Sequence, residues 1–160
     1  MPDATPIYLS TIGVHLKYAP EATAGTRPTS GYVDLPGIKS IPAMTAAPDA
    51  LETTTLNETE YKTYIQGLKD LGGSLDFTFN LSEVIKTAWE TLMTAYATAA
   101  AASKKIWFFV DVPGLSQGLF FPGTPSAMGL PELGVNSVAE VTNAITPTGA
   151  PVWAAKPSST

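Results

Sequence analysis

The segment SLDFTFNLSEVIKTAWETLMTAYATAAAA (residues 74–102) decides the fold, because its apolar pattern changes abruptly from one period to another. Leu75, Phe77 and Phe79 alternate with polar residues, which predicts a strand with an aromatic inner face. From residue 81 to about residue 102 the apolar side chains recur at helical spacing instead, at Val84, Ile85, Ala88, Trp89, Leu92, Met93, Tyr96 and Ala99. This pattern predicts an amphipathic helix that packs on the sheet.

Both ends of this helix carry signals of their own. Asn80 is followed three residues later by Glu83, a spacing that resembles a capping box and predicts a helix start there. Lys104 and Lys105 follow the last apolar residue, where positive charge is favourable against the negative end of the helix dipole.

Strand signals dominate the rest of the chain. In residues 11–18, Ile12, Val14 and Leu16 alternate with other residues, so His15 is expected to point away from the core. Residues 58–68 fit either a short helical turn or a strand that ends at Gly67. The other β-prone segments are residues 38–41, 51–56, 106–112, 118–121, 135–145 and 151–155. One helix among roughly seven strands predicts a mainly β protein, an antiparallel β-sandwich or barrel with a flanking α-helix.

Composition limits the function. A chain of 160 residues suits a single domain over residues 1–160, and with no cysteine it has no disulfide or thiolate chemistry. A net charge of −5 argues against a protein that binds nucleic acid tightly. Only 14% of the residues are charged, against about 25% in ordinary soluble domains. Such a surface fits either a chain covered by copies of itself or a plain β-domain.

The sequence shows no export or membrane signal. The N-terminus lacks the basic patch and apolar run of a secretory signal. Residues 84–102 form the longest apolar stretch, but Lys86 and Glu90 interrupt it, so it falls short of the ~18 apolar residues of a membrane span. Synthesis in the cytoplasm is therefore expected.

Residues 19–37 and residues 122–134 are predicted to be loops, because prolines and glycines recur in both segments. The first is unusually long for an ordered domain, so it is either a functional loop that folds on a partner or a disordered surface loop. A polar tail is expected at residues 156–160.

None of the catalytic or metal-binding patterns has the context that its chemistry needs. Residues 114–118 (GLSQG) match the G-x-S-x-G pattern of a hydrolase, but a strand rather than a helix follows Ser116, and His15 is the one histidine of the chain. No phosphate-binding glycine motif and no metal-ligand spacing is present. We therefore expect no catalytic, cofactor-binding or metal-binding residues.

A resemblance to a known family comes from residues 33–81. The segments IKSIP (38–42), LETTTLN (51–57) and YIQGLKD (64–70), the last leading into SLDFTFN (74–80), resemble the phage major tail tube protein family in their co-occurrence and order. That family is similar to type VI secretion tube proteins. The resemblance implies a β-sandwich or barrel with a flanking helix that assembles into hexameric rings, and rings that stack into a tube.

A tail tube protein would be a structural subunit of the virion without a cofactor. The resemblance implies that its main partner is the chain itself, with tape-measure and tail completion or initiation proteins as further partners. DNA would pass through the tube without specific binding, which suits a net negative protein. A tube of a contractile injection or type VI-like secretion system, or a monomeric β-sandwich binding or decoration module, remains an alternative.

Two sets of residues are candidates for these roles. The long loop would contact the adjacent ring through Tyr18, Arg27, Tyr32, Val33 and Leu35. We expect it to be mobile in an isolated subunit, because little apolar surface is available to anchor it. The polar faces of two strands would line the channel through Glu52, Thr54, Asp76 and Thr78.

Overall fold

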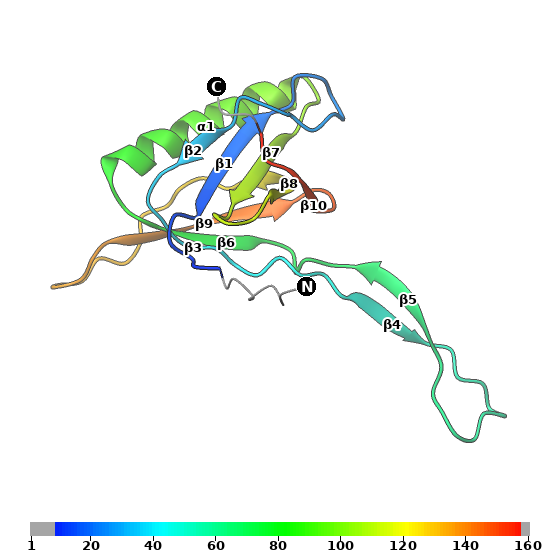
Figure 1. Cartoon of the computed structure of the whole chain (residues 1–160). Helices are drawn as coiled ribbons and strands as arrows, with labels where there is room; N and C mark the ends of the chain where they lie inside the picture. The colour runs from blue at the N-terminus through cyan, green and yellow to red at the C-terminus, as the bar shows by residue number, and fades with distance from the viewer. Residues whose placement is uncertain (1–8, 158–160) are drawn as a thin grey trace, which may run out of the picture.

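The computed structural model describes residues 9–157, which form ten strands and one helix. The strands are β1 (His15–Pro20), β2 (Val33–Leu35), β3 (Ile38–Ser40), β4 (Pro48–Glu52), β5 (Tyr64–Lys69), β6 (Leu75–Asn80), β7 (Ile106–Asp111), β8 (Gln117–Pro125), β9 (Glu140–Pro147) and β10 (Val152–Ala155). Helix α1 (Glu83–Ala101) lies between β6 and β7. The predicted mainly β architecture with one flanking helix is confirmed (Figure 1).

Eight strands form one curled antiparallel sheet in the order β2-β1-β7-β8-β9-β6-β3, with β10 added beside β8. Strands β2 and β3 stand at opposite ends of this order, yet only Pro36 and Gly37 separate them in the chain. Gly37 has a positive φ of 79°, which favours glycine at this turn. This two-residue connection keeps the end strands β2 and β3 near each other. The sheet is therefore curled into a half-barrel instead of lying flat.

Strand β8 is the centre of the sheet. Along one edge it pairs with β7, and along the other it pairs first with β10 and then with β9. Phe120 lies opposite Val152, whereas Gly123 lies opposite Pro147. Residues 148–151 connect β9 to β10 along this edge, where the Thr148 N–H donates to the Pro122 carbonyl at 2.9 Å. Strand β9 pairs with β8 only at its C-terminal end, and its other residues pair with β6.

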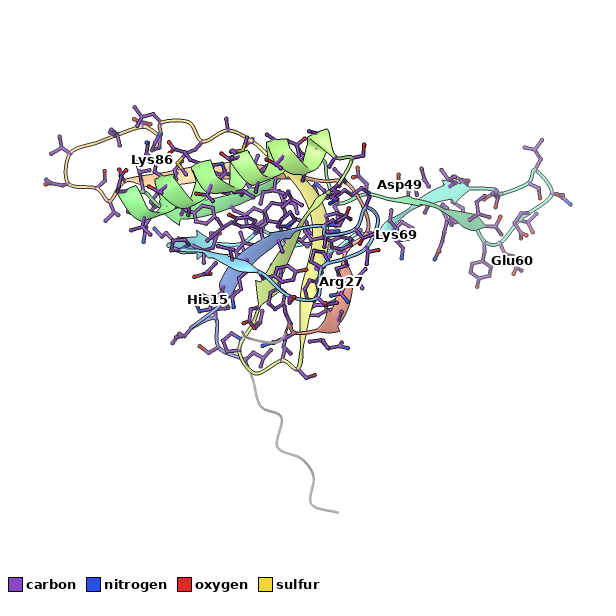
Figure 2. All side chains as sticks on the ribbon, turned by 90° about the horizontal axis from the view of Figure 1, so that it is seen from above. His15, Arg27, Asp49, Glu60, Lys69 and Lys86 are labelled. Carbon is purple, nitrogen blue, oxygen red and sulfur yellow. The ribbon has the colours of Figure 1, made fainter. Side chains whose placement is uncertain are left out.

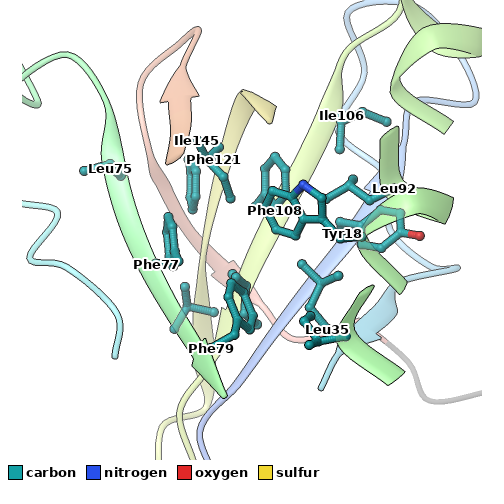
Figure 3. Close-up of a cluster of buried hydrophobic side chains, with 14 of the residues drawn as sticks. Tyr18, Leu35, Leu75, Phe77, Phe79, Leu92, Ile106, Phe108, Phe121 and Ile145 are labelled. Carbon is teal, nitrogen blue, oxygen red and sulfur yellow. The ribbon is translucent and has the colours of Figure 1, made fainter. Parts of the chain in front are cut away.

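The core lies between this curled sheet and α1 (Figure 3). Phe77 and Phe79 are fully buried, as the alternation of the β6 sequence predicted. Trp89 of the helix packs edge-on against Phe79 with 5.8 Å between ring centroids, and Phe108 stacks on Phe121 at 5.4 Å. Each such side chain contributes roughly 1.5–3 kcal/mol on burial. The sheet and the helix thus share one aromatic core.

The helix begins two residues later than the Asn80 cap predicted. Ser82 is the N-cap, and its Oγ accepts a hydrogen bond from the backbone N–H of Ile85 at 3.4 Å. Asn80 is the last residue of β6, opposite Glu140 of β9, so the sheet already uses its backbone. The predicted Asn80 cap is therefore wrong.

At the C-terminus of the helix, Ser103 adopts a positive φ of 57°. The N–H of Ser103 donates to the Ala100 carbonyl at 3.1 Å, and the N–H of Lys104 donates to the Ala99 carbonyl at 2.8 Å. This hydrogen-bond pattern is that of a Schellman motif. The two lysines follow the helix and do not lie in its last turn.

Several predicted boundaries shift. Strand β1 begins at His15, which is exposed as expected, while Ile12 lies outside it and is 83% exposed. Residues 64–69 form β5, so a strand rather than a helical turn is present in the segment 58–68, but it leaves out residues 58–63 and ends at Lys69 instead of Gly67. Strand β4 covers residues 48–52 rather than 51–56, and β8 extends to Pro125 into the predicted second loop.

The predicted loop at residues 19–37 is shorter and better anchored than expected, since β1 and β2 take both its ends. Residues 21–32, which we call the clamp, cover the face of β7 and β8 opposite the core. Tyr32 packs edge-on against Phe109 and Phe120, at 5.6 Å from each ring, and burial raises its pKa to about 12. The Arg27 guanidinium lies 4.4 Å from the centre of the Phe120 ring, within cation–π range. The expectation of a loop without internal anchors is wrong for this segment.

Glu21 fixes the start of the clamp. Its carboxylate is 4% exposed and accepts hydrogen bonds from the backbone N–H groups of Gly25 and Lys105, each at 3.0 Å, and from Trp107 Nε1 at 2.9 Å. Burial raises the pKa of Glu21, but these hydrogen bonds and the charge of Lys105 outweigh that effect and lower it overall. The clamp is therefore tied to the β7 strand through one ionised carboxylate.

Lys156, the first residue of the predicted polar tail, is fixed to the end of β7. Lys156 Nζ donates to the Val112 carbonyl at 2.9 Å and pairs with the Asp111 carboxylate at 2.6 Å. The last three residues of the predicted tail, 158–160, lie outside the described residues.

We predict that Glu21→Gln lowers the free energy of unfolding by about 1–3 kcal/mol at neutral pH, because the amide cannot replace an ionised acceptor of three hydrogen bonds. A carboxyl group whose pKa is lower in the folded state stabilises the fold above its unfolded pKa, and that contribution is lost as the pH falls through the folded value. Melting temperatures should therefore differ at pH 7 and converge in acid. An equal difference at pH 7 and at pH 3 would contradict this role.

Candidate assembly surfaces

Strands β4 and β5 form a separate two-stranded sheet that projects from the half-barrel (Figures 1 and 2). We call this hairpin, residues 48–69, the arm. Nearly all of its residues are exposed. A two-stranded hairpin without a supporting surface is at best marginally stable in water. Within residues 9–157, the arm has no third strand or packed helix to support it.

The two faces of the arm differ. Leu51 lies opposite Ile65 on one face, where they are 51% and 57% exposed. Thr53 continues this face, and its N–H donates to the Thr63 carbonyl at 2.8 Å. Because side chains alternate between faces along a strand, the residues next to these lie on the other side of the hairpin.

The opposite face of the arm mixes polar and apolar side chains. Glu52 lies there opposite Tyr64, and its carboxylate pairs with Lys62 at 3.4 Å. Ala50 and Gln66 form the neighbouring pair. Tyr64 is 53% exposed, so this face presents an aromatic ring beside a carboxylate, whereas the first face presents two aliphatic side chains. The tip of the arm adds two further exposed apolar side chains, Leu56 and Tyr61.

A second apolar surface lies at the other end of the molecule. In Figures 1 and 2 the loop between β8 and β9 extends away from the barrel on the side opposite the arm. Its exposed apolar side chains are Leu130, Leu133, Val135 and Val138. Between this loop and α1 the surface is hollowed into a groove of about 770 Å³. We call it the helix groove; its apolar lining comes from Leu81, Trp89, Met93, Met128 and Leu130.

The structure does not bring the five predicted ring-contact residues together on an accessible surface. Tyr18 and Leu35 are core residues, 3% and 1% exposed. Arg27 and Tyr32 are engaged in the clamp, and Val33 of β2 is 52% exposed. Of this set, Val33 alone is freely available to a partner.

The four predicted channel-lining residues divide between two parts of the molecule. Asp76 and Thr78 lie on β6, and the Thr78 hydroxyl is 3.3 Å from the Thr142 hydroxyl on β9. Glu52 and Thr54 belong to the arm, where the Thr54 hydroxyl accepts a hydrogen bond from the Thr63 N–H at 3.0 Å. These four side chains therefore do not share a strand face.

The G-x-S-x-G match has a structural explanation. Gly114 lies in the turn between β7 and β8 with a φ of 90°. A Cβ at Gly118 would lie 1.8 Å from the Phe109 ring, so that ring requires glycine there. Ser116 is exposed in the turn, while His15 Nδ1 lies 3.3 Å from an Asp34 carboxylate oxygen. Within residues 9–157 no hydrogen bond joins the serine to the histidine.

No three metal-ligating side chains cluster in the described part of the chain. The helix that the structure describes lacks the length and apolarity needed to cross a membrane.

Comparison with known proteins gives a match by structure alone. Neither the protein-family models nor the curated proteins contain a match to this chain. Among solved structures, the chain is similar to a chain in the six-fold symmetrised cryo-EM structure of the anti-feeding prophage (AFP) baseplate. The TM-score is 0.59 at 12% identity, and the match covers 95% of this chain and 97% of the other. The two proteins share a fold over nearly their whole lengths.

We predict that Gly118→Ala destabilises the protein by roughly 1–3 kcal/mol, because the new methyl group overlaps the Phe109 ring. The matched variant Ser116→Ala, in the same motif but exposed, should stay within about 0.5 kcal/mol of wild type. Urea unfolding measures both values. Equal stability of the Gly118→Ala variant and wild type would show that the ring does not depend on this glycine.

Proposed function

We propose that this protein is a structural subunit of a phage tail or tail-like particle, specifically of the tube. The observation that carries the proposal is the arm, a projecting hairpin whose Leu51 and Ile65 stay more than half exposed, because no other part of residues 9–157 covers them. Burial of Leu51 and Ile65 against another subunit would contribute roughly 1.5–3 kcal/mol for each side chain. Assembly thus supplies what the single chain lacks.

The fold supports the same function. The similar chain belongs to a baseplate of six-fold symmetry, and its extent matches this chain nearly end to end. The resemblance of residues 33–81 to the tail tube family leads to the same class of particle. We propose that six copies form a ring, that rings stack into a tube, and that the tube joins tape-measure and tail completion proteins in the virion.

The strand faces of β6 and β9 opposite the core are suited to the channel wall. They present Asp76, Thr78 and Thr142, which are small or acidic side chains. Asp76 of each subunit would place negative charge on this wall, which would repel the phosphates of passing DNA instead of holding them. In this arrangement DNA passes without specific binding.

A tube of a contractile injection system is the second candidate function. It is favoured by the similar chain, whose particle is named as the anti-feeding prophage baseplate. The two functions share subunit geometry and differ in what passes through the tube. A monomeric binding module is disfavoured, because it would leave the apolar face of the arm exposed permanently.

We further propose that the protein has no hydrolase activity. Ser116 occupies a hairpin turn and has no described hydrogen bond to a base. Purified protein should not hydrolyse an activated ester above the rate seen with Ser116→Ala. A rate that the substitution abolishes would overturn this expectation.

The arm can be tested with one charge placed on either face. We predict that Leu51→Glu abolishes rings and tubes, because it puts a carboxylate into the buried contact, while the monomer keeps its stability within about 0.5 kcal/mol. The control Gln66→Glu places the same charge on the opposite face and should assemble normally. Negative-stain electron microscopy and sedimentation velocity measure assembly. Normal tubes from Leu51→Glu would remove the apolar face from the contact.

A further inference from the structure

We propose that the Asn143 side chain binds an internal water molecule at the point where β9 separates from β8. The ligand is water, and its site lies at the junction of β9, the β8–β9 loop and α1. This inference goes beyond the proposed function and does not depend on it, because it concerns the interior of a single subunit.

Asn143 is a buried amide without a hydrogen-bond partner in the protein. It is 1% exposed and faces the aromatic core of Figure 3 between Val141 and Ile145, opposite Phe77 of β6. Neither its Oδ1 nor its Nδ2 has a hydrogen-bond partner among residues 9–157. A flip of the amide would only exchange these two atoms, so it would leave both unpaired. The amide therefore lacks the bonds that buried polar groups normally make.

The other buried polar groups are paired. The Glu21 carboxylate accepts hydrogen bonds from two backbone N–H groups and one indole N–H. Asp111 also has a buried oxygen, but Lys156 Nζ lies 2.6 Å from it. Asn143 is thus the exception among the buried polar side chains of residues 9–157.

The pairing of β8 with β9 ends beside this residue. The last hydrogen bonds between them are those of Ser126, whose N–H donates to the Ala144 carbonyl at 2.9 Å and whose Oγ accepts from the Ala144 N–H at 3.2 Å. Between residues 127–138 and residues 141–143 the described chain has no backbone hydrogen bond. Strand β9 therefore has an open edge from this point toward its N-terminal end.

The open edge carries polar groups of its own. Residues of an antiparallel strand direct their N–H and C=O groups alternately to the two edges. Because Ala144 directs both groups to Ser126, Thr142 directs both of its groups to the same edge. There the surface is hollowed by about 240 Å³, between residues 140–142 and residues 129–131. Polar backbone groups and space for water thus meet beside Asn143.

Helix α1 fixes the position of this corner. Trp89 Nε1 donates to the Ser126 carbonyl at 2.8 Å, and the Trp89 ring packs edge-on against Phe79. Trp89 is itself 1% exposed, so the junction of helix and sheet is closed to solvent on the core side. A water bound here would be an internal one and would exchange slowly with the bulk.

Water meets the requirements of the site. One molecule both donates and accepts, so it can bind the Asn143 amide and the Thr142 backbone together. Folded proteins hold on the order of one buried water per 27 residues, typically with about three hydrogen bonds to groups that would otherwise be unpaired. The water would supply the hydrogen bonds that the edge of β9 lacks after Ser126.

NMR cross-relaxation with water, measured on the wild-type protein, tests the site directly. A bound internal water gives NOE and ROE signals of opposite sign at the Nδ2 protons of Asn143. The exposed amides of Asn80 and Asn136 are controls in the same spectrum. These two should show only exchange with bulk water, for which both signals have the same sign.

The Asn143→Leu variant gives a second measurement, because leucine has a similar size and no hydrogen-bonding group. Leucine would displace the water and leave the open edge of β9 without its partner, so the midpoint of urea unfolding should fall. The matched variant Asn80→Leu replaces an exposed asparagine on the neighbouring strand β6 and should leave the midpoint nearly unchanged.

A bound-water signature at Asn143 together with a lower midpoint for Asn143→Leu would support the site. A midpoint above that of wild type would overturn the inference, because removal of the amide would then relieve an unpaired group. A crystal structure with a protein group hydrogen-bonded to the amide would also contradict it. If the leucine variant does not fold, the wild-type NMR signals decide, and absence of the bound-water signature overturns the inference.

Discussion

The pairing of β8 determines how the rest of the molecule is arranged. Because β8 holds β7 along one edge and divides the other edge between β10 and β9, the sheet must curl. The curl brings Phe77 of β6 to Phe121 of β8 with 6.3 Å between ring centroids, although the two strands do not pair. Helix α1 closes the open side of this aromatic core, and the clamp covers the opposite face of β7 and β8.

Apolar surface that remains outside these two layers is concentrated in a few places. The arm and the β8–β9 loop account for most of the large exposed apolar side chains between residues 9 and 157. Both project from the barrel, so the rest of residues 9–157 leaves them uncovered. The proposed assembly would explain the low charge content of the sequence, because charges on a surface that contacts other subunits would have to be desolvated.

The sequence predicted elements whose partners lie in the same chain. The alternation of Phe77 and Phe79 and the helical spacing around Trp89 each reflect one buried face, which is why both predictions were confirmed. The arm was missed as a unit because an alternating strand has the same pattern whether its partner is its own core or another molecule. The clamp was missed because Arg27 and Tyr32 find their partners on strands about 80 residues away, and no local pattern records such contacts. The helix cap was predicted two residues too early, because the pairing of Asn80 with Glu140 in the sheet is a tertiary contact that the local sequence does not reveal.

In the proposed assembly the arm becomes stable only against another subunit, and amide hydrogen exchange measures this stability residue by residue. Residues 48–69 should exchange close to the rate of an unstructured chain in the monomer, because local opening of an unsupported hairpin costs little free energy. The β6 and β9 amides should be protected in both states. After assembly the arm amides should become protected as well. Arm amides that are already protected in the monomer, or that stay unprotected in the tube, would contradict this account.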